Sequence, residues 1–148
     1  EAGNAEDVKT AVHMGAVRIG HGVRIAGNKE VIQLVKDKGV FLEMCPTSNR
    51  QTKAMEEMSA YPLKAFLEMG LKVTVNTDDP AIERTTLSRE FRYMESLLDL
   101  TQEQKRLLLL NSVEAAFTSR NRKCKLKEQL FSEPYENYDE PIIYKRIK

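Results

Sequence analysis

The stretch AVRIGHGVRIAGNKEVIQLVKDKGVFLEMCP, residues 16–46, decides the fold. The segment 16–22 is typical of a short strand, and in the segment 28–39 apolar residues recur at helical spacing behind Asn28, a candidate N-cap. The segment 40–46 is almost entirely apolar, which is typical of a strand that a parallel sheet buries on both faces. The stretch therefore predicts a strand–helix–strand unit.

The same order continues on both sides of this unit. Residues 5–14 have the pattern of a helix, residues 61–70 form a further predicted helix with Pro62 in its first turn, and residues 71–80 begin as a strand, Lys72–Val75. Strands that alternate with helices at a spacing of roughly 30 residues are typical of a parallel sheet. We therefore predict an α/β protein.

Two longer helices follow, LSREFRYMESLL at 87–98 and TQEQKRLLLLNSVEAAFTS at 101–119. Ser88 and Thr101 are their candidate caps, because short polar side chains there can accept backbone hydrogen bonds. The run Leu107–Leu110 has four apolar residues, so we predict that it is a buried turn of a helix.

Length and composition limit the domain organisation and the function. The chain has 148 residues, and a closed (β/α)8 barrel needs at least about 200. It begins at Glu1 without a signal pattern, so we expect either a removed leading segment or a piece of a longer protein. We expect residues 1–120 to form a partial barrel domain and residues 121–148 a short helix and tail.

Charge and cysteine content exclude several classes of partner. Lys and Arg number 23 against 22 Asp and Glu, so neither nucleic acid nor an anionic membrane is expected to bind. No apolar run approaches the ~20 residues that a membrane span needs. Cys45 and Cys124 make neither a disulfide framework nor a metal knuckle, which favours the reducing cytoplasm.

Polar residues gather where each predicted strand ends. They are Gly20-His21-Gly22, then Cys45-Pro46-Thr47-Ser48-Asn49, then Asn76-Thr77-Asp78-Asp79-Pro80. In parallel α/β sheets ligands bind at the carboxyl ends of the strands. The three segments therefore predict one edge of an active site.

Each candidate residue also has a structural alternative. Asp78 and Asp79 should point in different directions, so that one could bind a metal and the other a substrate, but Asp-Asp-Pro is also good turn chemistry. His21 could act as a base or a ligand, or be an ordinary hydrogen-bonded residue. Ser48 and Asn49 could be loop caps or supporting donors.

Taken in order, these motifs resemble the C-terminal half of the adenosine deaminase family. The resemblance rests on Glu1-Ala2-Gly3, Arg18-Ile19-Gly20-His21-Gly22, the segment Glu43 to Thr52 (EMCPTSNRQT) and Asn76-Thr77-Asp78-Asp79-Pro80, and it covers residues 1–120. It implies strands six to eight of a (β/α)8 TIM barrel, followed by C-terminal helices.

The resemblance also implies roles for single residues. Glu1 would protonate purine N1, His21 would orient and polarise the attacking water, and Asp78 would bind zinc. Asp79 would hydrogen-bond purine N7. Ser48 and Glu43 would not contact the zinc or the substrate, and would orient the groups that do.

The implied reaction is the hydrolytic deamination of adenosine or deoxyadenosine at C6, which gives inosine or deoxyinosine and ammonia. Gly20 favours these substrates, because related adenine deaminases tend to carry Asp before the histidine. Two alternatives stay open: an adenine or nucleotide deaminase of the same superfamily, and a non-catalytic half-barrel that assembles as an oligomer.

The family's other zinc ligands are not in this sequence. Of the ligand set only Asp78 is present, and the chain contains two histidines in all. A catalytic zinc needs three protein ligands. We therefore expect no bound catalytic Zn²⁺ and no deaminase activity from this chain alone. Its expected partners are a purine nucleoside, the missing N-terminal half of the barrel, or a second copy that pairs with the sheet's two open edges.

Overall fold

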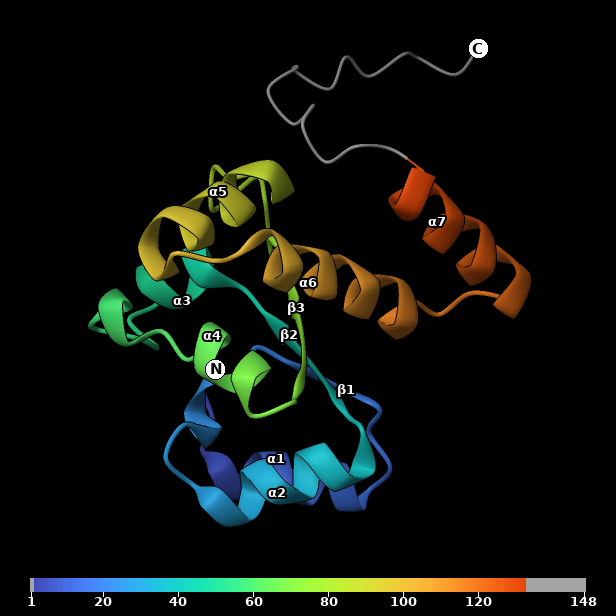
Figure 1. Cartoon of the computed structure of the whole chain (residues 1–148). Helices are drawn as coiled ribbons and strands as arrows, with labels where there is room; N and C mark the ends of the chain where they lie inside the picture. The colour runs from blue at the N-terminus through green and yellow to red at the C-terminus, as the bar shows by residue number, and fades with distance from the viewer. Residues whose placement is uncertain (1, 133–148) are drawn as a thin grey trace.

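The computed structural model describes residues 2–132. Helices and strands alternate along most of this part of the chain (Figure 1). In chain order the elements are α1 (Ala5–His13), β1 (Arg18–Gly20), η1 (Val23–Ile25), α2 (Lys29–Lys38), β2 (Phe41–Met44), α3 (Pro46–Gln51), η2 (Met58–Ala60), α4 (Leu63–Glu68), β3 (Lys72–Val75), α5 (Leu87–Leu98), α6 (Gln102–Ala115) and α7 (Arg120–Ser132).

The strands form one parallel sheet in the order β1-β2-β3. Gly20 lies opposite Glu43, which in turn lies opposite Thr74, so the three strands end at nearly the same level. The predicted parallel α/β sheet is confirmed. This register places the segments that follow the strands side by side, as a site at the carboxyl edge requires.

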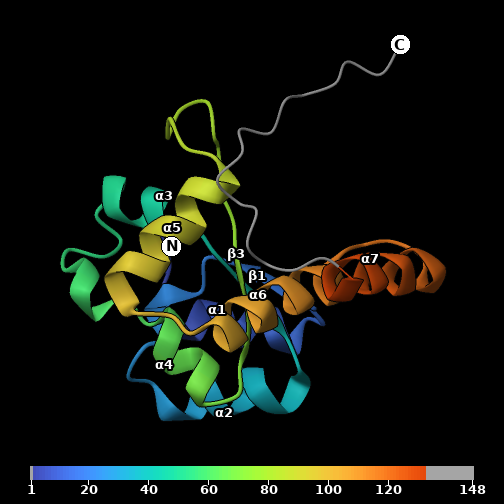
Figure 2. The ribbon, with the colours of Figure 1, turned by 45° about the horizontal axis from the view of Figure 1, so that its top comes forward.

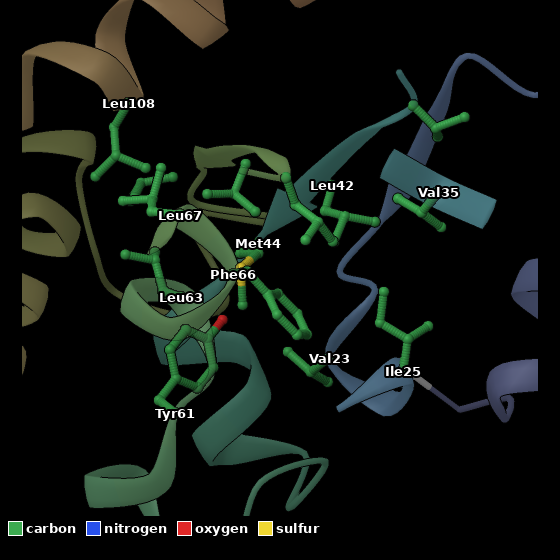
Figure 3. Packing of buried hydrophobic residues seen from close by; sticks show 14 of the residues in the cluster. Val23, Ile25, Val35, Leu42, Met44, Tyr61, Leu63, Phe66, Leu67 and Leu108 are labelled. Atoms are coloured by element: carbon green, nitrogen blue, oxygen red, sulfur yellow. The ribbon is translucent and has the colours of Figure 1, made fainter. Parts of the chain in front are cut away.

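One face of the sheet packs on the helices. Leu42 and Met44 of β2 are fully buried, and Figure 3 shows Leu63 and Phe66 of α4 beside them. Burial of such a side chain stabilises the fold by roughly 1.5–3 kcal/mol. This core fixes the strands against α2 and α4 and so holds their carboxyl ends in place.

α6 packs against β3 and crosses it in both views (Figures 1 and 2). The backbone of Asn76 donates to Met44 O, so by the alternation of a parallel ladder the carbonyl of Val73 points away from β2. The side chain of Asn111 in α6 donates to that carbonyl at 2.9 Å. Within residues 2–132 neither outer edge of the sheet has a strand paired to it, as predicted, but α6 covers part of the edge of β3.

Three local predictions are corrected. Residues 46–51 form helix α3 instead of a loop, because Pro46 at the first helical position supplies the φ that a helix needs. The N-cap of α5 is Thr86 and not Ser88. Leu108 is fully buried but Leu107 is 42% exposed, because a helix of about 3.6 residues per turn cannot turn four consecutive residues to one side.

The C-terminal segment is described only as far as α7, which packs against α6 and lies at the periphery in both views (Figures 1 and 2). The predicted tail from residue 133 and the predicted role of Glu1 lie outside the described residues. No helix between residues 2 and 132 combines the length and apolar character that crossing a membrane requires.

Candidate active site at the strand ends

The segments that follow the three strands line one open cavity of about 480 Å³. His21 follows β1, Cys45 follows β2, and Asn76 and Asp78 follow β3. Ser112 of α6 lines the same cavity from the other side. The cavity therefore lies at the carboxyl edge of the sheet, where the sequence predicts an active site.

His21 and Asp78 face each other across this cavity. Nε2 of His21 lies 3.7 Å from Oδ2 of Asp78. Both residues have left-handed backbones, with φ of 63° and 60°. Such a conformation is uncommon for residues other than glycine and persists only where surrounding contacts hold it, which is typical of functional sites. For His21 one such contact is the bond of 2.8 Å from its backbone N–H to Glu43 O.

Ser48 supports Asp78 from α3. Its hydroxyl donates to Oδ2 of Asp78 at 2.7 Å, and its side chain is buried. The hydrogen bond fixes the carboxylate plane while the side chain of Asp78 stays 41% exposed toward the cavity. The bond joins the segment after β2 to the segment after β3, and the supporting role of Ser48 stays a prediction.

The other ring nitrogen of His21 contacts Asn49. Nδ2 of Asn49 lies 2.9 Å from Nδ1 of His21, and the hydroxyl of Tyr61 donates to Oδ1 of Asn49 at 2.8 Å. Asn49 and Tyr61 are both buried. Tyr61 could not be found from the sequence, because it lies between η2 and α4 and nothing in its neighbourhood marks a polar contact.

Glu43 lies beside this group on β2. Its carboxylate pairs with Arg18 at 3.2 Å and lines the cavity. The side chain of Arg18 is also held over the ring of Phe117, 3.6 Å from its centroid. Glu43 is therefore oriented by a cation within the sheet.

Asp79 has a different environment from Asp78. It is exposed, and its Oδ1 accepts a hydrogen bond of 3.4 Å from Ile82 N–H in the following turn. It is not among the residues that line the cavity. The two carboxylates do diverge as predicted, and the contacts of Asp79 are those of the turn that was the alternative interpretation.

Sequence reasoning missed Glu90, a buried carboxylate of α5. Its two oxygens accept hydrogen bonds from Thr47 N–H at 3.0 Å and from the Thr85 hydroxyl at 2.5 Å. It ties α5 to the start of α3, next to Ser48. A usable signal was present: Glu90 is four residues before the fully buried Met94, on the core face of an amphipathic helix.

The described residues do not complete a zinc site. Between residues 2 and 132 no three side chains of His, Cys, Asp or Glu lie close enough together to hold a metal ion. His21 and Asp78 are one such pair, and catalytic zinc takes three protein ligands. Further ligands would have to come from outside this part of the chain.

The fold is shared with solved structures of a purine deaminase and of an amidohydrolase. The adenine deaminase from Arthrobacter aurescens is 30% identical and superposes with a TM-score of 0.84 over 88% of this chain and 40% of its own. An amidohydrolase from Burkholderia ambifaria described with bound Zn, 22% identical, superposes with a TM-score of 0.73 over 88% of this chain and 40% of its own, which shows the shared fold.

The chain belongs to the adenosine deaminase family, whose model matches residues 1–133. An adenosine deaminase from Clostridium botulinum strain Okra is 44% identical over 128 residues, which are 86% of this chain and 38% of the relative. An adenosine deaminase from Enterococcus faecalis is 39% identical over 130 residues, 88% of this chain and 39% of the relative. The chain thus spans well under half the length of these relatives.

Proposed function

We propose that this chain supplies one edge of the active site of a zinc-dependent adenosine deaminase. The observation that carries the proposal is the meeting of His21 and Asp78, 3.7 Å apart, at the ends of two strands that belong to separate family motifs. The substrate would be adenosine or deoxyadenosine, and the reaction would belong to purine metabolism. The low count of two cysteines in 148 residues, Cys45 and Cys124, supports a cytoplasmic location.

The proposed reaction is a hydrolysis at purine C6. The oxygen of water bonds to C6, the bond from C6 to the amino nitrogen breaks, and ammonia leaves; no oxidant or reductant is needed. His21 would hold the attacking water, Asp79 would bind purine N7, and Glu1 would protonate N1. For Asp79 this requires release of its contact with Ile82.

Zinc would bind to Asp78 with ligands from another segment. The bond from Ser48 already orients the Asp78 carboxylate, as supporting hydrogen bonds do for metal ligands. The described residues alone fall short of the ligand set. We therefore propose that this chain on its own holds no catalytic zinc and has no deaminase activity, and that it works with the N-terminal part of a barrel.

A chimera tests the proposal. Residues 5–132 of this chain replace the matching segment of the C. botulinum relative, and purified protein is assayed for bound zinc and for adenosine hydrolysis by absorbance. We expect activity in the chimera, loss of both zinc and activity with Asp78→Ala, and loss of activity with zinc retained with His21→Ala. An exposed carboxylate away from the cavity, Glu103, provides the matched control Glu103→Ala. A folded, zinc-loaded chimera without activity would contradict the proposal.

An adenine or nucleotide deaminase is the second candidate, and the likeness to the A. aurescens adenine deaminase supports it. The two candidates differ in what must fit beside Gly20, where an added Cβ would meet no atom within 4 Å. A panel of adenosine, deoxyadenosine, adenine and AMP on the chimera separates them.

A non-catalytic assembly through the outer edge of β1 is the third candidate, and light scattering across protein concentration tests it.

A further inference from the structure

We propose that Asn49 and Tyr61 are positioning residues that fix the His21 imidazole in one tautomer, with its proton on Nε2. The proposal concerns the neutral ring and its hydrogen bonds, and only its consequence for the reaction rests on the proposed function. It assigns a role to two buried polar side chains of α3 and of the segment before α4.

The structure orients the Asn49 amide with Oδ1 toward the Tyr61 hydroxyl and Nδ2 toward the His21 ring. An asparagine side chain accepts hydrogen bonds only through Oδ1 and donates only through Nδ2. The hydroxyl of Tyr61 donates to Oδ1 at 2.8 Å, so Nδ2 is directed to Nδ1 of His21, 2.9 Å away. A donor at that distance requires a lone pair on Nδ1. The proton of the neutral ring must then be on Nε2.

The amide is held on several sides. Asn49 is 0% exposed and Tyr61 3% exposed. The backbone of Asn49 donates to Cys45 O at 2.9 Å and accepts from Met55 N–H at 3.0 Å. A rotated amide would instead donate to the Tyr61 oxygen and accept from a protonated Nδ1 of His21, so the two orientations predict opposite tautomers. Buried and paired in this way, the amide is a rigid reference for the histidine ring.

The fixed tautomer directs the Nε2–H bond into the site. Oδ2 of Asp78 lies 3.7 Å from Nε2, which is too far for a direct hydrogen bond. An oxygen placed beside both groups would accept from Nε2 and so be oriented by His21. In the proposed deaminase that oxygen belongs to the attacking water, and His21 acts on it as a hydrogen-bond donor.

Nitrogen NMR on the 148-residue chain tests the tautomer directly. The chain has two histidines, and His13 at the exposed end of α1 serves as the reference within the same spectrum. At about pH 9, where an ordinary imidazole is neutral, long-range ¹H–¹⁵N spectra distinguish the protonated ring nitrogen from the bare one. We expect His21 to show a protonated Nε2 and a bare Nδ1, and His13 to show a mixture of both tautomers.

Two variants sharpen the test. Asn49→Asp places an acceptor at Nδ1, so the two nitrogen signals of His21 should interchange. Tyr61→Phe removes the hydroxyl that orients the amide, so His21 should move toward the mixture seen for His13. The matched control is Asn28→Asp, because Asn28 caps α2 and an aspartate caps equally well; it should leave His21 unchanged.

A proton on Nδ1 of His21 in the unmodified protein overturns the proposal, whether or not any variant folds. An unchanged His21 spectrum in Asn49→Asp, with amide spectra that show a folded chain, also overturns it. Neither measurement involves substrate or zinc. An inactive chimera would therefore contradict the proposed function and leave the tautomer result as it stands.

Discussion

His21 and Asp78 come within 3.7 Å of each other although the strands that they follow, β1 and β3, are separated by β2. Neighbouring strands lie about 4.8 Å apart, so the two backbones are about 10 Å apart at the strand ends. Their left-handed conformations turn both side chains toward the gap. The pair is thus a product of backbone geometry as much as of side-chain type.

Two substitutions of Asp78 should show whether the stability of the fold depends on the left-handed backbone at this position or on the negative charge. Asparagine tolerates a left-handed backbone, so Asp78→Asn should change the free energy of unfolding by less than about 0.5 kcal/mol. Asp78→Val should cost about 1–3 kcal/mol, because a β-branched residue is strained at φ 60°. Urea unfolding measures both. Equal stability of the two variants would contradict this account.

Substitution of the two glycines beside His21 by alanine should change the free energy of unfolding by different amounts. Gly22 has φ 74°, and an added Cβ would lie 2.7 Å from Cδ2 of the buried Leu42, so Gly22→Ala should cost about 1–3 kcal/mol. Gly20→Ala is the matched control, because its Cβ would meet nothing within 4 Å, and we expect a change within about 1 kcal/mol. Thermal and urea unfolding of the pair should show this order; the reverse order would refute it.

Removal of the Glu90 carboxylate should loosen α5 from α3. Glu90→Leu leaves the buried Thr47 N–H without its acceptor and should cost about 2–3 kcal/mol, while Glu90→Gln keeps one acceptor oxygen and should cost about 1 kcal/mol. The exposed Glu103→Gln is the control and should stay within about 0.5 kcal/mol. If Glu90→Leu proves as stable as the control, then Glu90 does not tie the two helices together.

The contact of α7 with α6 should weaken in acid. The hydrogen bond from Lys127 is the main cause that lowers the pKa of Glu114 below its ordinary value of 4.5, against a smaller opposing effect of burial. The folded carboxylate has the lower pKa, so its stabilisation is complete above about pH 4.5 and is lost as the pH falls through the lowered value. Exchange of the α7 amides, divided by the intrinsic rate that itself slows in acid, should therefore rise as the pH falls.

Glu114→Gln should show the faster exchange already at neutral pH and lack this acid-dependent step. Glu128→Gln, which removes an exposed carboxylate of α7 itself, should behave like the unmodified chain. If the exchange of α7 amides in Glu114→Gln rises in acid by as much as in the unmodified chain, the pH dependence belongs to another group.

Loss of the Asn111 side chain should open the edge of β3. Asn111→Ala leaves the Val73 carbonyl without its donor, which should cost about 1–2 kcal/mol and expose a template for strand pairing. We expect its mass in solution to rise with concentration more steeply than that of Ser112→Ala, whose hydroxyl donates within α6 to Leu108 O. Chromatography with light scattering compares the two, and identical profiles would rule out this role of Asn111.

Sequence periodicity predicted the regular elements well. The bounds of β3 (Lys72–Val75) and of α5 (Leu87–Leu98) agree with the prediction, because apolar spacing and a clear change of composition mark them. α3 was missed because Pro-Thr-Ser-Asn is typical of loops, whereas Pro46 at the first helical position and the burial of the side chains that follow it favour the helix.

The candidate site could be predicted as a set of residues but not as a set of contacts. The strand ends identified His21, Ser48 and Asp78, which the structure brings together. Tyr61 and Glu90 could not be found in the same way. They act on α3 from other elements, and their partners are separated from them by 12 and 43 positions in the chain.

The contact of α6 with β3 makes the two outer strands of the sheet unequal as sites for a further strand. Asn111 is 38 positions from Val73, and both belong to the described chain, so their contact forms within one molecule at any dilution. A strand that joins β3 must compete with the Asn111 side chain for the Val73 carbonyl. Pairing of a further strand should therefore be slower at β3 than at β1.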